Sequence, residues 1–100
     1  MITLCVLLWP NPGQEQGLAD YETEVLALLA RHGATLVSRV SNPDHNDQLP
    51  YEVQIIDLPG EDALESYLKD PDRAALSDLR DRVVARTELM RVTKIDRPSI

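Results

Sequence analysis

Residues 51–58 read Tyr-Glu-Val-Gln-Ile-Ile-Asp-Leu and are followed by Pro59 and Gly60. β-Branched and aromatic residues are enriched in strands, and a Pro-Gly pair ends regular structure, so we expect a strand over 51–58. Apolar residues at helical spacing over 61–86 predict a helix in two pieces, because an aspartate and a proline at 70 and 71 are typical of a helix start. Alternating residues over 88–95 predict a further strand. The second half of the chain therefore predicts strand, broken helix and strand.

The first half of the chain repeats this plan. Residues 2–9 are apolar at almost every position, which is typical of a strand. Over 18–32, apolar or aromatic residues and a terminal histidine lie three or four positions apart on one helical face: Leu18, Tyr21, Val25, Leu28 and His32. Residues 34–40 follow as a strand whose alternation places Thr35 and Arg39 on the same face.

The predicted order is thus βαββαβ. Right-handed crossovers then give a ferredoxin-like α+β fold, a four-stranded antiparallel sheet with both helices on one face. We expect one domain over 1–95 and a loose C-terminal tail over 96–100. The other sheet face has no cover, although the strand over 2–9 is apolar on both of its faces. We therefore expect a homodimer in which two sheets pack face to face.

Composition excludes several kinds of partner. The chain has 100 residues and a net charge of −7, and its ten basic residues are interleaved with seventeen acidic ones. This balance argues against nucleic acid and anionic lipid as partners. The single cysteine, Cys5, lies in an apolar run and predicts a buried thiol rather than a disulfide or a nucleophile. The sequence predicts neither a membrane span nor a signal peptide, and we expect a cytoplasmic protein.

Several segments resemble a known family. A small βαββαβ chain that pairs sheet to sheet resembles the dimeric α/β-barrel superfamily, which includes antibiotic-biosynthesis monooxygenases, muconolactone isomerases and YCII-related proteins. The similarity to one uncharacterised group of that superfamily lies in segments 17–22, 28–34, 55–60, 63–71 and 76–80. The resemblance implies the fold, the homodimer and small-molecule chemistry, but no single reaction.

The chain also departs from the characterised members of this superfamily. The first strand lacks the histidine expected of YCII-related proteins, and the only helix histidine, His32, is misplaced for a haem ligand. Phenylalanine is absent and there is one tryptophan, so an aromatic cage is poorly supplied. We therefore expect no cofactor.

Candidate site residues follow from a pocket expected between sheet and helices. The residues able to bind a ligand there are Trp9, Tyr21, Arg39, Tyr67 and Arg91. The two arginines have two interpretations: they bind a carboxylate or enolate, or they pair with an acid such as Asp57 or Glu88. The second interpretation is favoured.

Two catalytic candidates and one loop complete the prediction. Asp57 is a possible base if burial raises its pKa, or it caps the following helix. His45 lies on a long polar loop and titrates near neutrality, although an exposed loop residue is the simpler interpretation. Asp44, His45 and Asp47 match no metal-ligand motif, and we expect no metal site.

Two classes of function remain open from the sequence. One is a small cofactor-free enzyme of monooxygenase or isomerase type that acts on a small organic or polyketide-like molecule. The other is a non-catalytic homodimer that binds a small molecule or only assembles. An empty, well-shaped cavity favours the first class, and a cavity filled by the protein's own side chains favours the second.

Overall fold

The structure is a computed structural model that describes residues 1–95. The predicted tail over 96–100 lies outside the described residues. In chain order the elements are β1 (Ile2–Pro10), α1 (Glu15–Leu26), the 3-10 helix η1 (Leu29–His32), β2 (Thr35–Ser41), β3 (Glu52–Leu58), α2 (Glu61–Leu68), α3 (Pro71–Ala74), α4 (Ser77–Val83) and β4 (Val84–Val92).

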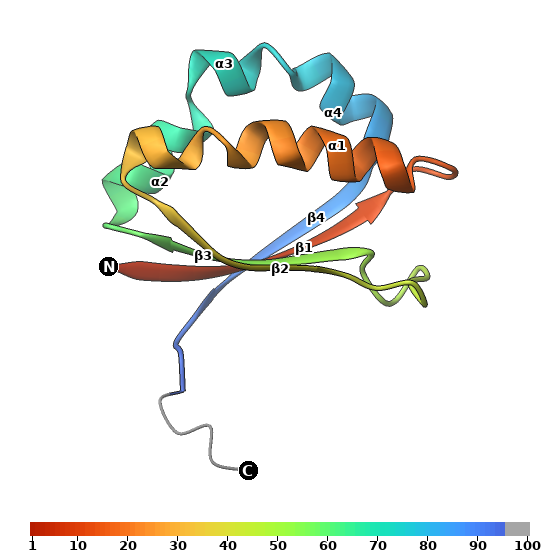
Figure 1. Ribbon diagram of the computed structural model, residues 1–100, viewed down its shortest axis with the longest axis horizontal. Coiled ribbons are helices and arrows are strands. Elements are labelled where there is room, and N and C mark those ends of the chain that lie inside the picture. Colours follow the sequence, from red (N-terminus) through yellow and green to blue (C-terminus); the bar gives the residue numbers. More distant parts are fainter. Residues whose placement is uncertain (96–100) are drawn as a thin grey trace.

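The four strands form one antiparallel sheet in the order β2-β3-β1-β4. Figure 1 shows all helices on one face of this sheet and no element of the described chain on the other. This arrangement confirms the predicted ferredoxin-like α+β fold. No helix within residues 1–95 combines the length and apolar character needed to cross a membrane.

The core lies between the sheet and α1. Leu4, Val6 and Leu8 of β1 point toward the helices and are at most 8% exposed. Cys5 and Leu7 alternate with them, point to the open face and are half-buried. The predicted two-faced apolar character of this strand therefore holds, but only one of its faces is covered within the described chain.

The helices are more broken than the sequence predicts. The first helix ends at Leu26 and is followed by η1, which ends at Gly33 in the left-handed conformation (φ +70°) that glycine adopts at low cost. The second helix forms three pieces. Asp70 caps α3 through the backbone N–H of Asp72, and Pro71 occupies the first helical position, as predicted.

Two strand predictions are wrong in detail. β4 begins at Val84 rather than at residue 88, because backbone pairing with β1 already starts where Pro10 lies opposite Val84. In β2 the register shifts between Leu36 and Ser38, so a β-bulge interrupts the alternation. Arg39 therefore lies on the helix-covered face and not on the face of Thr35.

Candidate functional site

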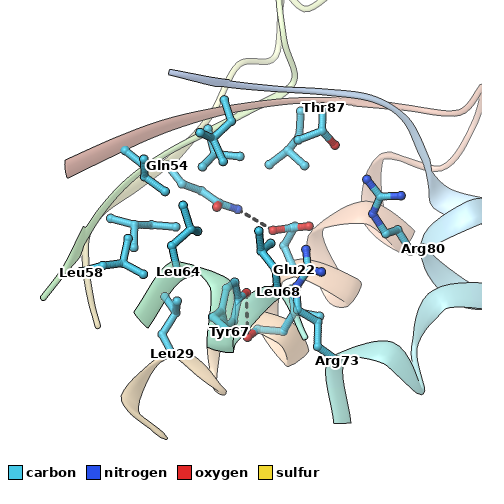
Figure 2. Close-up of a pocket in the computed structure, with 16 residues that line it drawn as sticks. Glu22, Leu29, Gln54, Leu58, Leu64, Tyr67, Leu68, Arg73, Arg80 and Thr87 are labelled. Carbon is cyan, nitrogen blue, oxygen red and sulfur yellow. Dashed lines mark hydrogen bonds between the residues drawn. The ribbon is translucent and has the colours of Figure 1, made fainter. Parts of the chain in front are cut away.

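A cavity of about 180 Å³ lies between the helices and the sheet. Its walls are mostly apolar side chains from β1, β3, α1, η1 and α2, and six lining residues carry polar side chains: Glu22, Gln54, Tyr67, Arg73, Arg80 and Thr87. Figure 2 shows these side chains around the cavity. An apolar cavity of roughly 150 Å³ is large enough to bind benzene, so this one suits a single-ring molecule.

Among the described residues that line this cavity, Glu22 carries the only carboxylate. It is 6% exposed and lies on the buried stripe of α1, four residues after Leu18 and three before Val25. Burial raises the pKa of the Glu22 carboxyl above its ordinary value, and the nearby charge of Glu52 adds to this effect. A hydrogen bond from Gln54 Nε2 to Glu22 Oε1, 2.7 Å long, acts in the opposite direction. A carboxylate with a raised pKa is a stronger base at neutral pH.

A polar network connects Glu22 to the protein surface. The amide of Gln54 donates to both Glu22 and Glu52, each at 2.7 Å (Figure 2 shows the Glu22 bond). Arg39 forms a bidentate ion pair with Glu52: Nε donates to Oε2 at 2.8 Å, and a second guanidinium N–H donates to Oε1 at 3.2 Å. Arg39 also donates to the hydroxyl of Thr23 and to a carbonyl of α1. The network fixes the position of Gln54, which in turn orients the Glu22 carboxylate.

Tyr67 and Arg73 lie near one end of the cavity. The Tyr67 hydroxyl donates to the carbonyl oxygen of Val25 at 3.1 Å, so it already has a partner. Burial raises the pKa of Tyr67, so its hydroxyl group stays neutral. The Arg73 guanidinium carbon lies 5.1 Å from the centre of the Tyr67 ring, within the range of a cation–π contact.

One of the five ligand-binding candidates predicted from the sequence lines this cavity. Tyr67 lines it, whereas Tyr21 is 2% exposed in the core and is not part of the lining. Trp9 lies elsewhere, in a groove that His45 also lines. There the Arg86 guanidinium carbon lies 3.8 Å from the centre of the Trp9 ring, and the indole N–H donates to the carbonyl of Asn46. The structure thus places Trp9 and His45 together, away from Glu22.

The charged candidates form ion pairs outside the cavity. Arg39 pairs with Glu52, and Arg91 pairs with Glu61 through two hydrogen bonds. Both arginines therefore form ion pairs, but their acidic partners differ from those expected. Asp57 lies on the open sheet face, where it accepts hydrogen bonds from Lys94 and Thr3. These bonds lower the pKa of Asp57, which is the reverse of what a base at this position requires.

No group of three or more metal-ligating side chains occurs within the described residues 1–95. In the 44–47 loop, His45 Nε2 instead lies 3.4 Å from a carboxylate oxygen of Glu15. The ring of His45 also packs edge-on against Tyr51, with 5.0 Å between the ring centres.

A serine, a histidine and an aspartate form a second polar cluster. His32 Nε2 lies 2.7 Å from Asp70 Oδ2, and Nδ1 lies 2.9 Å from Ser66 Oγ. The hydrogen bond from His32, followed by that from the Asp72 backbone, lowers the pKa of Asp70, so its carboxylate is ionised and accepts. His32 Nε2 therefore carries a proton, and in the neutral ring Nδ1 accepts from the Ser66 hydroxyl. The cluster ties η1 to α2 and to the start of α3.

Four polar residues of this cavity were not predicted from the sequence: Glu22, Gln54, Arg73 and Arg80. Glu22 had a signal in the sequence, since it is a charged residue at a position of the apolar helical stripe. Gln54 alternates with Ile56 and Leu58 on the buried face of β3. A polar side chain on the buried face of an apolar strand is the signal that identifies it.

No protein-family model and no curated protein matches this sequence. Solved structures do match it. A protein of unknown function from Rhodopseudomonas palustris is 18% identical with a TM-score of 0.76, covering 96% of this chain and 83% of that one. A NIPSNAP domain protein from Burkholderia xenovorans is 12% identical with a TM-score of 0.75, covering 96% of each chain. A candidate antibiotic biosynthesis monooxygenase from Bacteroides thetaiotaomicron is 16% identical with a TM-score of 0.69, covering 99% of this chain and 93% of that one. These comparisons confirm the predicted resemblance at the level of the fold: the chain has the ferredoxin-like fold that these proteins share.

Proposed function

We propose that this protein is a small cofactor-free enzyme, of isomerase or monooxygenase type, that removes a proton from a compact organic molecule. The observation that carries the proposal is Glu22, a buried carboxyl with a raised pKa on the wall of an otherwise largely apolar cavity. The volume of about 180 Å³ fits a single ring and is too small for a polyketide of several fused rings.

The chemistry begins at a carbon next to a carbonyl group. The Glu22 carboxylate takes the proton, and the electron pair left on carbon moves onto the carbonyl oxygen to form an enolate. Arg73 and Arg80 line the same cavity, so the negative charge of the enolate develops in surroundings of positive charge that lower its energy. Return of the proton at another carbon gives an isomer, whereas an oxygenase-type reaction proceeds from the same enolate and consumes O₂.

Deuterium exchange tests this step without knowledge of the final product. The protein is incubated in D₂O with single-ring ketones and keto acids, and proton NMR follows loss of the signal next to the carbonyl. We expect exchange above background with the wild type and loss of that exchange in Glu22→Gln. Glu24→Gln is the matched control, since Glu24 is exposed on the same helix. Equal exchange in wild type and Glu22→Gln refutes the assignment of Glu22 as base.

Ligand binding without turnover is the second candidate function. It is favoured by the hydrogen bond from Gln54, which already occupies one oxygen of the Glu22 carboxylate. Under this alternative, ligands raise the melting temperature but no deuterium enters them. A ligand at one hundred times its dissociation constant adds about 2.7 kcal/mol, which raises the melting temperature of a domain this size by more than about 10 °C.

We also propose that two copies pair through their open sheet faces. Support comes from the apolar character of that face, where Val40 is 55% exposed, Met90 is 47% exposed, and Cys5, Leu7 and Ile55 are half-buried. Light scattering at micromolar concentration then gives twice the chain mass of 11.2 kDa.

A matched pair of variants tests this assembly. Met90→Lys places a charge on the open face and should give monomers. Leu68→Lys changes a similarly exposed apolar residue on the helical side and should leave the dimer intact. A stable wild-type monomer refutes the proposed pairing.

A further inference from the structure

Arg73 and Arg80 differ from most other arginines within residues 1–95, because they form no ion pair there and line the cavity; Arg82 also forms no ion pair but lies outside the cavity. Among residues 1–95, four arginines lie within 4 Å of a carboxylate oxygen: Arg31, Arg39, Arg86 and Arg91. Neither Arg73 nor Arg80 forms such a pair within the described chain, and both line the cavity. The cavity wall thus carries two guanidinium groups whose charge no side chain of the described part balances by direct contact.

Arg73 also has an unsatisfied donor. Its Nε atom is buried and forms no hydrogen bond within the described structure. Buried donors are almost always paired, so such an atom calls for an explanation. Glu22, the carboxylate of the same cavity, does not supply the partner, since it bonds to Gln54 and forms no ion pair with either arginine. An acceptor that comes from outside the chain would satisfy Arg73.

The cavity is open to solvent. Leu68 and Leu89 both line it, and they are 46% and 42% exposed, so they mark its mouth. Figure 2 shows Arg73 and Arg80 on the same side of the cavity, away from the apolar end formed by Leu29 and Leu58. A ligand therefore meets positive charge at one end and apolar side chains at the other.

We propose that Arg73 and Arg80 bind the carboxylate of a single-ring organic acid whose ring occupies the apolar part of the cavity. Planar guanidinium groups match a carboxylate in shape and charge, and each offers paired N–H donors. A single negative charge is favoured over two, because Glu22 lies on the same cavity and the protein carries a net charge of −7. This inference rests on the proposed function, since it names the class of substrate for the same cavity.

The test compares an acid with its neutral ester of similar size. Benzoate and methyl benzoate are titrated into the wild-type protein and their dissociation constants measured by ligand-observed NMR. We expect benzoate to bind at least tenfold tighter than its ester. Arg73→Gln and Arg80→Gln should each abolish this preference. Arg82→Gln is the matched control, because Arg82 is exposed on α4 and does not line the cavity, and it should keep the preference.

The outcomes separate the two proposals. If the ester binds as tightly as the acid, or if the preference for the acid survives in both cavity variants, the carboxylate assignment is wrong while the cavity remains a ligand site. If neither probe binds at millimolar concentration, the ligand site itself fails and the carboxylate assignment fails with it. Thermal unfolding of each variant shows that it is folded, and Arg80→Gln carries the test if Arg73→Gln does not fold.

Discussion

Replacing Arg39 with methionine should destabilise the protein far more than the same change at Arg91. Glu52 has a side chain that is only 3% exposed, and Arg39 is its bidentate partner. Removing one member of a buried pair leaves an uncompensated charge, at a cost of about 3 to 5 kcal/mol. We expect the lower end, about 3 kcal/mol, because the Arg39 side chain is 26% exposed and water can reach the site. Arg91 and Glu61 are both more than half exposed, so loss of their pair should change little.

Urea unfolding at fixed protein concentration, followed by the fluorescence of the single tryptophan, Trp9, measures this difference. With a slope of about 1 to 3 kcal/mol per molar urea, the Arg39→Met midpoint should fall by about 1 M or more. The double variant Arg39→Met with Glu52→Leu removes both charges and should be more stable than the single variant. If the two changes simply add, or if Arg39→Met unfolds at the wild-type midpoint, the described network does not stabilise the fold.

Two further perturbations test other parts of the structure. Asp70→Asn should lower stability at neutral pH, and the difference from wild type should shrink as the pH falls below about 4. The hydrogen bond from His32 lowers the pKa of Asp70 in the folded state. The stability that the Asp70 carboxylate contributes is therefore present above its unfolded-state pKa and is lost as the pH falls through its folded-state pKa. A stability difference between Asp70→Asn and wild type that stays constant with pH contradicts this reasoning. Gly17→Ala should destabilise. A Cβ there would lie 2.6 Å from Gln14 Oε1, the end of a flexible side chain that can move away, and 2.9 Å from Val83 Cγ1. Overpacking against Val83 costs about 1 to 3 kcal/mol, which outweighs the gain in helix propensity of about 1 kcal/mol. In a Val83→Ala background the same change should become neutral or stabilising, and thermal unfolding that shows no such reversal refutes the packing argument.

Local patterns in the sequence predict the fold well. Strands and helices follow from alternation and from helical spacing, and the start of α3 follows from Asp70 and Pro71. The β-bulge of β2 has no comparable signal, since neither glycine nor proline lies between Leu36 and Ser38. It depends on pairing with β3, which is a long-range property. The bulge changes the face on which Arg39 lies, so the partner of Arg39 could not be predicted either.

The candidate site was harder to predict because its polar residues come from separate elements. Arg73 and Arg80 lie on α3 and α4, two short helices whose position over the sheet follows from tertiary packing rather than from periodicity. Asp57 suggested a base because its neighbours in sequence are apolar. The sheet places it on the open face beside Lys94 instead. Sequence neighbours alone do not decide burial at the end of a strand.

The burial of Glu22 is the feature of the structure that fold stability explains least. Arg39 and Glu52 satisfy one another, whereas Glu22 is a second buried carboxyl without an ion-pair partner in the described chain. If Glu22 only filled space in the core, a neutral glutamine of the same shape would stabilise the fold more, because it would avoid the cost of burying a charge. Burial raises its folded-state pKa, so its favourable contribution is present below the unfolded pKa of about 4.3 and is lost as the pH rises through the folded pKa.

We therefore expect Glu22→Gln to be more stable than wild type at pH 7.5 and to lose that advantage near pH 4, as measured by urea unfolding. The gain in stability should accompany the loss of deuterium exchange, which is the trade-off typical of a group kept for activity. A variant that is less stable than wild type at pH 7.5 would show that the Glu22 carboxylate contributes to the fold, and the argument that it is kept for chemistry would then fail.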